Sequence, residues 1–221
     1  RATLVTLAVV LAILTIPIHA IVLRAPPRRA PRAAGAARGE DVPGMTLGVA
    51  ARMAVFWVLA IAFFVGNFTT SSVTVHLIPF LADRGYTPTL AAAMIGWMGA
   101  MQVPARVCFA AIAARFGYRA LNVGIFFGQA AGVAQLALAA TLPTLVPMVV
   151  ILGGANGMST LARATTIAEI FGPRHYGAIS GAVALGANGA RAIAPVGAAL
   201  LQVVLGGYER VFWVLTVTLV A

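Results

Sequence analysis

The stretch ALNVGIFFGQAAGVAQLALAATLPTLVPMVVILGGANGMSTLA, residues 120–162, decides the fold of this chain, because its 43 residues include no Asp, Glu, Lys or Arg. A transmembrane helix needs about 20 consecutive apolar residues, so this run is too long for one span and right for two. Pro143 and Pro147 mark the break, since proline is tolerated at the start of a helix and disfavoured in its interior. We therefore predict spans over residues 120–141 and 146–168.

The rest of the chain has the same character. Of its 221 residues, 61% are hydrophobic and 9% are charged, whereas soluble domains average about 25% charged residues. A soluble enzyme or binding domain could not cover its surface with so few charges, and disorder requires low hydrophobicity. The composition predicts an all-α membrane protein.

Further spans are expected over residues 3–23, 53–82, 88–114 and 177–205. The apolar run from Val211 to Ala221 has eleven residues, which is too short to cross a bilayer. We therefore predict six transmembrane helices plus a truncated seventh. The chain begins without Met and ends inside an apolar run, so we expect the protein to continue at both ends.

The arginines predict an orientation, and all 15 basic residues are arginine. Successive loops lie on alternate sides of the membrane, and basic residues favour the cytoplasmic side. One set of loops holds nine arginines, at positions 24, 28, 29, 32, 38, 52, 115, 119 and 174, and the other set holds Arg1, Arg84 and Arg210. The bias predicts that the basic linker 24–52 is cytoplasmic. Nucleic-acid binding is not expected, because no basic surface interleaved with aromatic residues is present.

Three arginines fall inside predicted spans, namely Arg106, Arg163 and Arg191. Intramembrane charges are costly and mark functional sites by default. Arg191 lies near mid-membrane and Arg106 is well inside the cytoplasmic edge, whereas Arg163 is shallow enough to snorkel in part. Each could instead pair between helices or act in gating.

All five acidic residues lie in or beside predicted loops, so no span holds a carboxylate to balance these arginines. An unpaired buried cation is expensive, and the planar guanidinium bonds both oxygens of a carboxylate. The sequence thus favours an anionic solute, or a carboxylate outside this chain.

Polar residues inside the spans are candidates to line a pathway. Asn67, Thr70, Ser71 and Thr74 share one face of a helix, at i, i+3, i+4 and i+7. Their hydroxyls could alternatively bond to helix carbonyls. Further candidates for substrate binding are Gln102, Asn156 and Asn188, and His76 is expected to be a structural histidine.

Small residues indicate helix packing faces, at Gly124/Gly128/Gly132, Gly153/Gly157 and Gly177/Gly181, because they allow close backbone approach in a membrane. The single cysteine, Cys108, excludes an internal disulfide and a cysteine-based metal site. No H-E-x-x-H or P-loop pattern is present. We expect no enzyme activity, no metal and no cofactor.

The segment Arg106-Val-Cys-Phe-Ala-Ala-Ile-Ala-Ala-Arg-Phe-Gly117-Tyr-Arg119 resembles the G-R-x-x-x-G-x-x-x-D-R-x-G-R-R pattern of the major facilitator superfamily, with Ala110 and Ala114 replacing a glycine and the usual aspartate. Residues 169–177 and 194–197 resemble the loop after helix ten and the helix-eleven pattern of that family. The resemblance implies the C-terminal half of a twelve-helix transporter: helix 6 at 1–23, the central cytoplasmic loop at 24–52, and helices 7–12 at 53–221. It also implies loop-motif roles for Arg115, Gly117 and Arg119. Further loop or gating candidates are Asp83, Arg84 and Arg163.

Within that family, residues 76–86 and 91–93 resemble the monocarboxylate-transporter and oxalate/formate-antiporter branch. There an arginine of helix eight binds the substrate carboxylate, and Arg106 is the matching position. The resemblance implies an alternating-access secondary transporter, symporter or antiporter, for a small organic anion, working in the bilayer with an N-terminal half that this chain lacks. A bacterial inner membrane is expected.

Two alternatives stay open. A drug or lipophilic-solute exporter would pair its arginines with acids of the missing half. A non-transporting membrane scaffold or sensor would instead hold a partner on the cytoplasmic linker.

Overall fold

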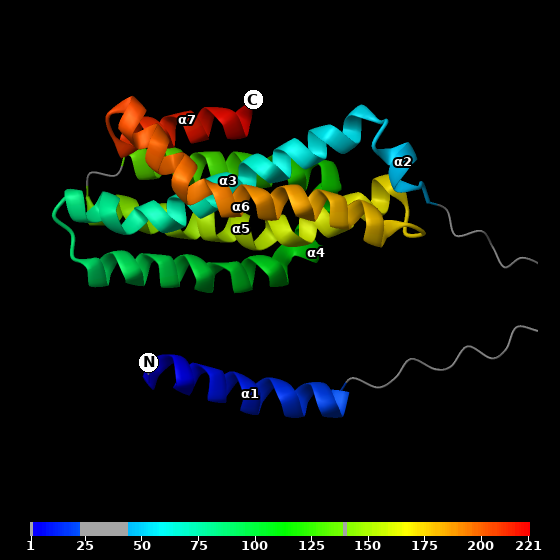
Figure 1. The fold of residues 1–221 in the computed structure, drawn as a ribbon, viewed down its shortest axis with the longest axis horizontal. Coiled ribbons are helices and arrows are strands. Elements are labelled where there is room, and N and C mark those ends of the chain that lie inside the picture. The colour runs from blue at the N-terminus through cyan, green and yellow to red at the C-terminus, as the bar shows by residue number, and fades with distance from the viewer. Residues whose placement is uncertain (1, 23–43, 139–140) are drawn as a thin grey trace, which may run out of the picture. The chain divides into compact units, whose positions relative to one another are not determined.

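The computed structural model describes residues 2–22, 44–138 and 141–221, and these residues form helices and short connections without any strand (Figure 1). The chain divides into two units, Arg1–Asp41 and Val42–Ala221. The first unit contributes one helix, α1 (Ala2–Val22), which matches the predicted span 3–23 and carries a single interior proline, Pro17. The linker residues up to 43 lie outside the described residues.

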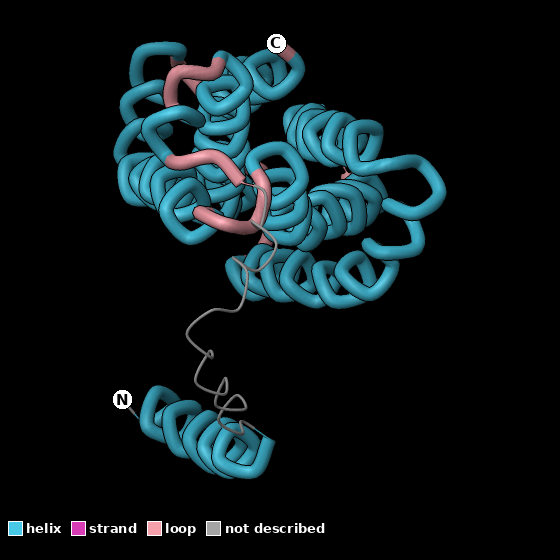
Figure 2. The backbone as a smooth tube through the Cα atoms, turned by 90° about the vertical axis from the view of Figure 1, so that its right-hand side faces the viewer, coloured by secondary structure: helices cyan, strands magenta, loops and turns pink. Residues whose placement is uncertain are grey.

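The second unit is a helical bundle. It contains α2 (Leu47–Ala50), α3 (Ala54–Asp83), α4 (Pro88–Leu138), α5 (Leu142–Phe171), α6 (Tyr176–Leu205) and α7 (Tyr208–Val220). The tube drawing in Figure 2 shows long helices joined by short turns. Such short connections place successive helices antiparallel to one another.

The helix bounds agree with the predicted spans within a few residues, except that two spans are joined. α4 runs through 51 residues, about 75 Å at 1.5 Å per residue and far more than a bilayer needs. Gly117 interrupts it with φ 78° and ψ 157°, a backbone conformation open essentially only to glycine. The turn expected at residues 115–119 is therefore a bend at a single residue.

Five helices among the described residues are long and apolar enough to cross a membrane, if α4 is counted once. The prediction of six spans plus a truncated seventh stays a prediction, and α7 has only 13 residues. α2 lies inside the predicted linker 24–52, where no helix was expected. It forms because Ala50 is fully buried beside Phe56 and Phe171, and the Met45 amide donates to the Phe171 carbonyl at 2.8 Å.

The two ends of the bundle carry different loops. The turns after α3 and α6 lie at one end, and α2, the bend of α4 and the α5–α6 turn lie toward the other (Figure 1). The second end therefore carries Arg52, Arg115, Arg119 and Arg174, and the first carries Arg84 and Arg210. Within the part of the chain that is described, this is the alternation of basic loops expected from the sequence.

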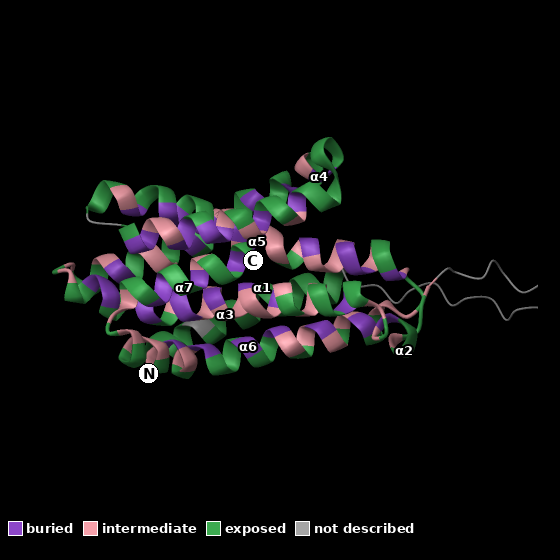
Figure 3. Cartoon of the chain, turned by 90° about the horizontal axis from the view of Figure 1, so that it is seen from above, coloured by how far each residue is buried: buried purple, intermediate pink, exposed green. Residues whose placement is uncertain are grey.

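Glycines hold α4 and α5 close together, as the packing prediction required. A Cβ at Gly132 would lie 2.8 Å from the Leu152 Cβ, and a Cβ at Gly157 would lie 2.7 Å from the Gln102 Cα. Figure 3 shows buried residues along the facing sides of the helices and exposed residues around the outside. The packing prediction fails at three glycines, where a Cβ would meet no neighbouring helix within 4 Å in the described part of the chain: Gly124, Gly177 and Gly181.

Candidate functional site

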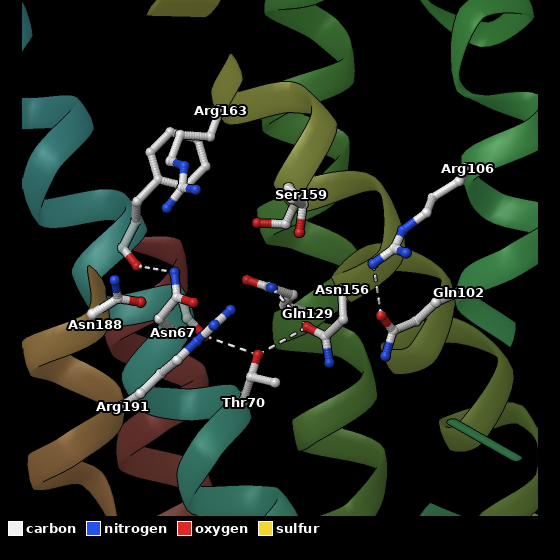
Figure 4. A pocket seen from close by; sticks show the side chains of 13 residues that line it. Asn67, Thr70, Gln102, Arg106, Gln129, Asn156, Ser159, Arg163, Asn188 and Arg191 are labelled. Atoms are coloured by element: carbon white, nitrogen blue, oxygen red, sulfur yellow. Dashed lines mark hydrogen bonds between the residues drawn. The ribbon is translucent and has the colours of Figure 1, made fainter. Parts of the chain in front are cut away.

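A cavity of about 300 Å³ lies between α3, α4, α5 and α6 (Figure 4). Its lining is almost entirely polar or charged. Thirteen residues line it: Phe63, Gly66, Asn67, Thr70, Gln102, Arg106, Gln129, Asn156, Ser159, Thr160, Arg163, Asn188 and Arg191. The volume is at the lower end of the range for small-molecule sites, about 300–1,000 Å³.

The cavity brings together most of the residues singled out in the sequence. Seven of the eight candidates for substrate binding line it, namely Asn67, Thr70, Gln102, Arg106, Asn156, Asn188 and Arg191. Arg163, a gating candidate, lines it as well. The eighth candidate, Ser71, is not among the lining residues.

Arg106 reaches the cavity from the first arm of α4 and is held by neutral groups. Its Nε donates to the Gly157 carbonyl at 3.3 Å, and one terminal nitrogen donates to Gln102 Oε1 at 3.2 Å (Figure 4). Gln102 lies one helical turn earlier, at i−4, so the two side chains share a face. Neither contact neutralises the guanidinium, so its full positive charge faces the cavity.

Two further guanidinium groups enter the same cavity. Arg163 comes from α5 and Arg191 from α6, so each of three helices supplies one arginine. The lining contains no Asp or Glu. An ion pair between described residues joins Arg84 to Glu209, at the loops of one end of the bundle and away from the cavity lining. The cavity therefore carries three positive charges and no negative charge of its own.

Amides and a hydroxyl form a network on the cavity wall. The Asn156 Oδ1 accepts from Thr70 Oγ1 at 2.8 Å and from Gln129 Nε2 at 2.9 Å, so three helical segments meet at one oxygen. Gln129 is 2% exposed, and its own Oε1 has no hydrogen-bond partner in the described structure. Gly66 leaves room for that amide, since a Cβ there would lie 3.0 Å from the oxygen.

Sequence reasoning missed five lining residues, and two of them, Ser159 and Thr160, carried a signal. Together with Asn156 and Arg163 they stand at i, i+3, i+4 and i+7, the pattern that marked the polar face of α3. Gln129 stood alone in an apolar run. The other two missed residues had no chemical signal at all, namely Phe63 and Gly66.

The polar face of α3 serves two purposes, and both open readings hold in part. The Thr74 hydroxyl donates to the Thr70 carbonyl at 2.8 Å, and the Asn67 amide donates to the Phe63 carbonyl at 2.7 Å. The Thr70 hydroxyl lies 2.9 Å from the Gly66 carbonyl as well as 2.8 Å from Asn156 Oδ1, and its single proton serves one of these two acceptors at a time. Thr70 and Asn67 line the cavity as well. Ser71 instead turns toward α6, where its Oγ donates to the Arg191 carbonyl at 3.2 Å.

His76 is a buried structural residue, as expected. It is 8% exposed, its Nε2 lies 3.0 Å from the Pro195 carbonyl, and its Nδ1 lies 3.3 Å from the Tyr208 hydroxyl. The carbonyl can only accept, so Nε2 carries the proton and the tyrosine donates to Nδ1. This histidine joins α3, α6 and α7.

The remaining loop and gating candidates lie at the ends of the bundle. Arg115 and Arg119 flank the bend at Gly117, and the Arg115 guanidinium lies 5.7 Å from the Phe116 ring centroid. Asp83 ends α3, and the Arg84 guanidinium covers the Phe80 ring at 4.3 Å. None of these residues lines the cavity, so their gating roles stay predictions.

Among the described residues, no three His, Cys, Asp or Glu side chains gather in a group that could hold a metal ion. The free Cys108 is exposed on α4, away from the cavity lining.

Comparison with known proteins identifies one family. The family model described as Major Facilitator Superfamily matches residues 1–195, which include both arms of α4, the whole of α5 and every residue of the cavity lining. No curated protein matches the sequence.

Proposed function

The chain belongs to the Major Facilitator Superfamily, a family of secondary transporters embedded in the membrane by several helices, and from this premise we propose that its cavity binds a small organic anion. The transporter would move this anion, such as a monocarboxylate, across the membrane by alternating access.

One observation carries the proposal: three guanidinium groups line one small cavity whose lining holds no carboxylate. Arg106 and Arg191 are exposed and Arg163 is half-buried, so these three positive charges are open to a ligand. An anionic solute supplies the missing partner, and arginine suits a carboxylate because its fork donates two parallel hydrogen bonds. Arg106 is the proposed main contact, with Arg191 as its partner or gate.

The amides and hydroxyls add selectivity in this proposal. The oxygen of Gln102 is already used by Arg106, and that of Asn156 by Thr70 and Gln129. The guanidinium groups and the Asn156 amide nitrogen remain as donors that suit an anion, while the Asn67 and Gln129 amide oxygens remain as acceptors. Two further amides complete the lining, Asn67 and Asn188.

The exporter of lipophilic solutes is less well supported. Pockets for such solutes are lined predominantly by hydrophobic and aromatic side chains. Here Phe63 is the one aromatic residue of the lining, and all the other lining residues except Gly66 have polar or charged side chains. A scaffold or sensor without transport has no specific observation in its favour.

The wider architecture is part of the same proposal. Residues 1–23 would be helix 6, residues 24–52 the central cytoplasmic loop, and residues 53–221 the C-terminal bundle of a twelve-helix carrier. The other half of the central cavity would come from the N-terminal half. The arginine-rich ends of the bundle helices would face the cytoplasm, in a bacterial inner membrane.

Uptake by the full-length carrier in liposomes tests the proposal, with radiolabelled lactate, pyruvate and oxalate as probes. Replacing Arg106 with Ala should lower the transport kcat/KM by at least about thirtyfold, because losing one partner of a buried charge pair costs about 2 kcal/mol or more. Arg210→Ala is the matched control, since this arginine caps the Leu205 carbonyl outside the cavity. Normal anion transport by Arg106→Ala would show that the assignment is wrong.

A further inference from the structure

Arg191 lies four residues before Pro195 in α6, and this spacing leaves its backbone carbonyl without its helical partner. In an α-helix the carbonyl of residue i accepts from the N–H of residue i+4. Proline has no N–H, so a proline inside a helix removes that hydrogen bond. The residue with the freed carbonyl is also the arginine that enters the cavity from α6.

Ser71 of α3 supplies the missing donor. Its Oγ lies 3.2 Å from the Arg191 carbonyl oxygen, within hydrogen-bonding distance, across 120 positions of sequence. Ser71 stands next to Thr70, a residue of the cavity wall, yet it does not line the cavity itself.

We propose that Ser71 is a positioning residue for the anion site, which fixes the backbone of Arg191 at the Pro195 break. The inference rests on the proposed function, because it assigns to Arg191 a contact with the anion. α6 lacks one backbone bond at this point, and a helix bends most readily where its ladder of bonds is interrupted. The bond from α3 fixes the carbonyl and with it the direction from which the guanidinium enters the cavity.

Two neighbouring contacts show why Ser71 differs from the rest of the face. Ser72 Oγ lies 3.5 Å from the Ala194 carbonyl, and His76 Nε2 lies 3.0 Å from the Pro195 carbonyl. The helix continues past both, so these carbonyls retain partners at residues 198 and 199, neither of which is proline. They hold α3 against α6 without capping an orphaned group. Of the three bonds, only that of Ser71 replaces one that the sequence removed.

This difference supplies a matched pair of variants. Ser71→Ala should raise the KM for the transported anion about threefold to tenfold, as expected for a lost hydrogen bond, with kcat changed less. Ser72→Ala, on the same helix and fully buried, should leave the KM within about twofold of wild type, since its carbonyl acceptor keeps a helix partner. Ser71→Thr keeps the hydroxyl and should restore the wild-type KM.

Pro195→Ala provides the decisive control, because it returns an N–H to position 195. The helix itself then satisfies the Arg191 carbonyl, and Ser71→Ala should raise the KM less than twofold in that background. A merely structural role for Ser71 would give the same loss in both backgrounds, so a double-mutant cycle separates the two. Thermal unfolding of each purified variant shows that the carriers compared are folded.

Arg191→Ala separates this inference from the function on which it rests. All these measurements use the full-length carrier in liposomes and whichever of lactate, pyruvate and oxalate it transports. If none is transported, or if Arg191→Ala leaves the KM unchanged, the anion proposal fails and Ser71 loses its role with it. If Arg191→Ala raises the KM but Ser71→Ala does not, or does so equally beside Pro195→Ala, the positioning role alone is overturned.

Discussion

Replacing Gly157 by alanine should force α4 and α5 apart at the anion cavity. A Cβ at this position would lie 2.7 Å from both the Cα and the carbonyl oxygen of Gln102, whereas ordinary contact begins at 3.4 Å. The obstacle is backbone, which no side-chain rotation can remove. The helices would therefore have to separate locally by the difference, about 0.7 Å.

The consequence for the site follows from the same geometry. The Gly157 carbonyl accepts from Arg106 Nε at 3.3 Å, so an added 0.7 Å would stretch this contact to about 4 Å, beyond a hydrogen bond. Overpacking of this kind costs about 1–3 kcal/mol, while alanine in a helix gains about 0.5–1 kcal/mol over glycine. We expect a net destabilisation of about 1–2 kcal/mol together with a higher KM for the anion.

Two other glycines of α5 serve as controls. A Cβ at Gly154 would lie 3.9 Å from the Ala105 Cβ, an ordinary contact, so Gly154→Ala should be neutral or stabilising. A Cβ at Gly153 would lie 2.6 Å from the Met98 carbonyl oxygen, outside the cavity, so Gly153→Ala should lower stability with less effect on the KM. Thermal unfolding in detergent and anion uptake measure both quantities. Equal stability and equal KM for Gly157→Ala and Gly154→Ala would refute the reasoning.

Three further substitutions test other parts of the structure. Gly117→Ala should destabilise the carrier by about 1–3 kcal/mol, because φ 78° and ψ 157° strain any side chain; Gly124→Ala, in open helix, is the control in thermal unfolding. Asn156→Asp should weaken anion binding at least tenfold in uptake competition, because it places a carboxylate among three guanidinium groups; an unchanged KM would exclude Asn156 from the site. Glu209→Gln removes the exposed ion pair with Arg84 and should change the free energy of unfolding by less than about 1 kcal/mol. A larger loss of stability would show that this pair stabilises its end of the bundle.

The fold could be predicted largely because a bilayer imposes few solutions. Apolar runs of about 20 residues with arginines between them specify spanning helices, and the helix bounds agree with the predicted spans within a few residues. The bend at Gly117 was not predicted, since the motif Arg115–Arg119 has the polarity of a loop. Gly117, in a backbone conformation that is rare for other residues, turns the chain there without a loop.

The site could be predicted where polar or charged residues interrupt the apolar spans. Arginines and amides inside apolar helices stand out, and seven of the eight candidates line one cavity. Ser71 belongs to the same polar face of α3 as Thr70, but its position near Pro195 of α6 depends on tertiary packing. Helical periodicity shows which residues share a face and does not show which neighbour that face meets.

The number of residues between the bend at Gly117 and the cavity also determines how deep in the bundle the lining residues lie. Arg106 stands 11 positions before Gly117 and Gln129 stands 12 positions after it. Both residues therefore lie at nearly the same level along the two arms of α4, about 17 Å from the bend. A deletion of one residue between Arg106 and Gly117 would turn the guanidinium by about 100° around the helix and move it about 1.5 Å along the axis. The number of residues between Arg106 and Gly117 thus determines the position of the guanidinium in the binding site. Insertions or deletions in this segment should impair anion binding as much as loss of the arginine itself.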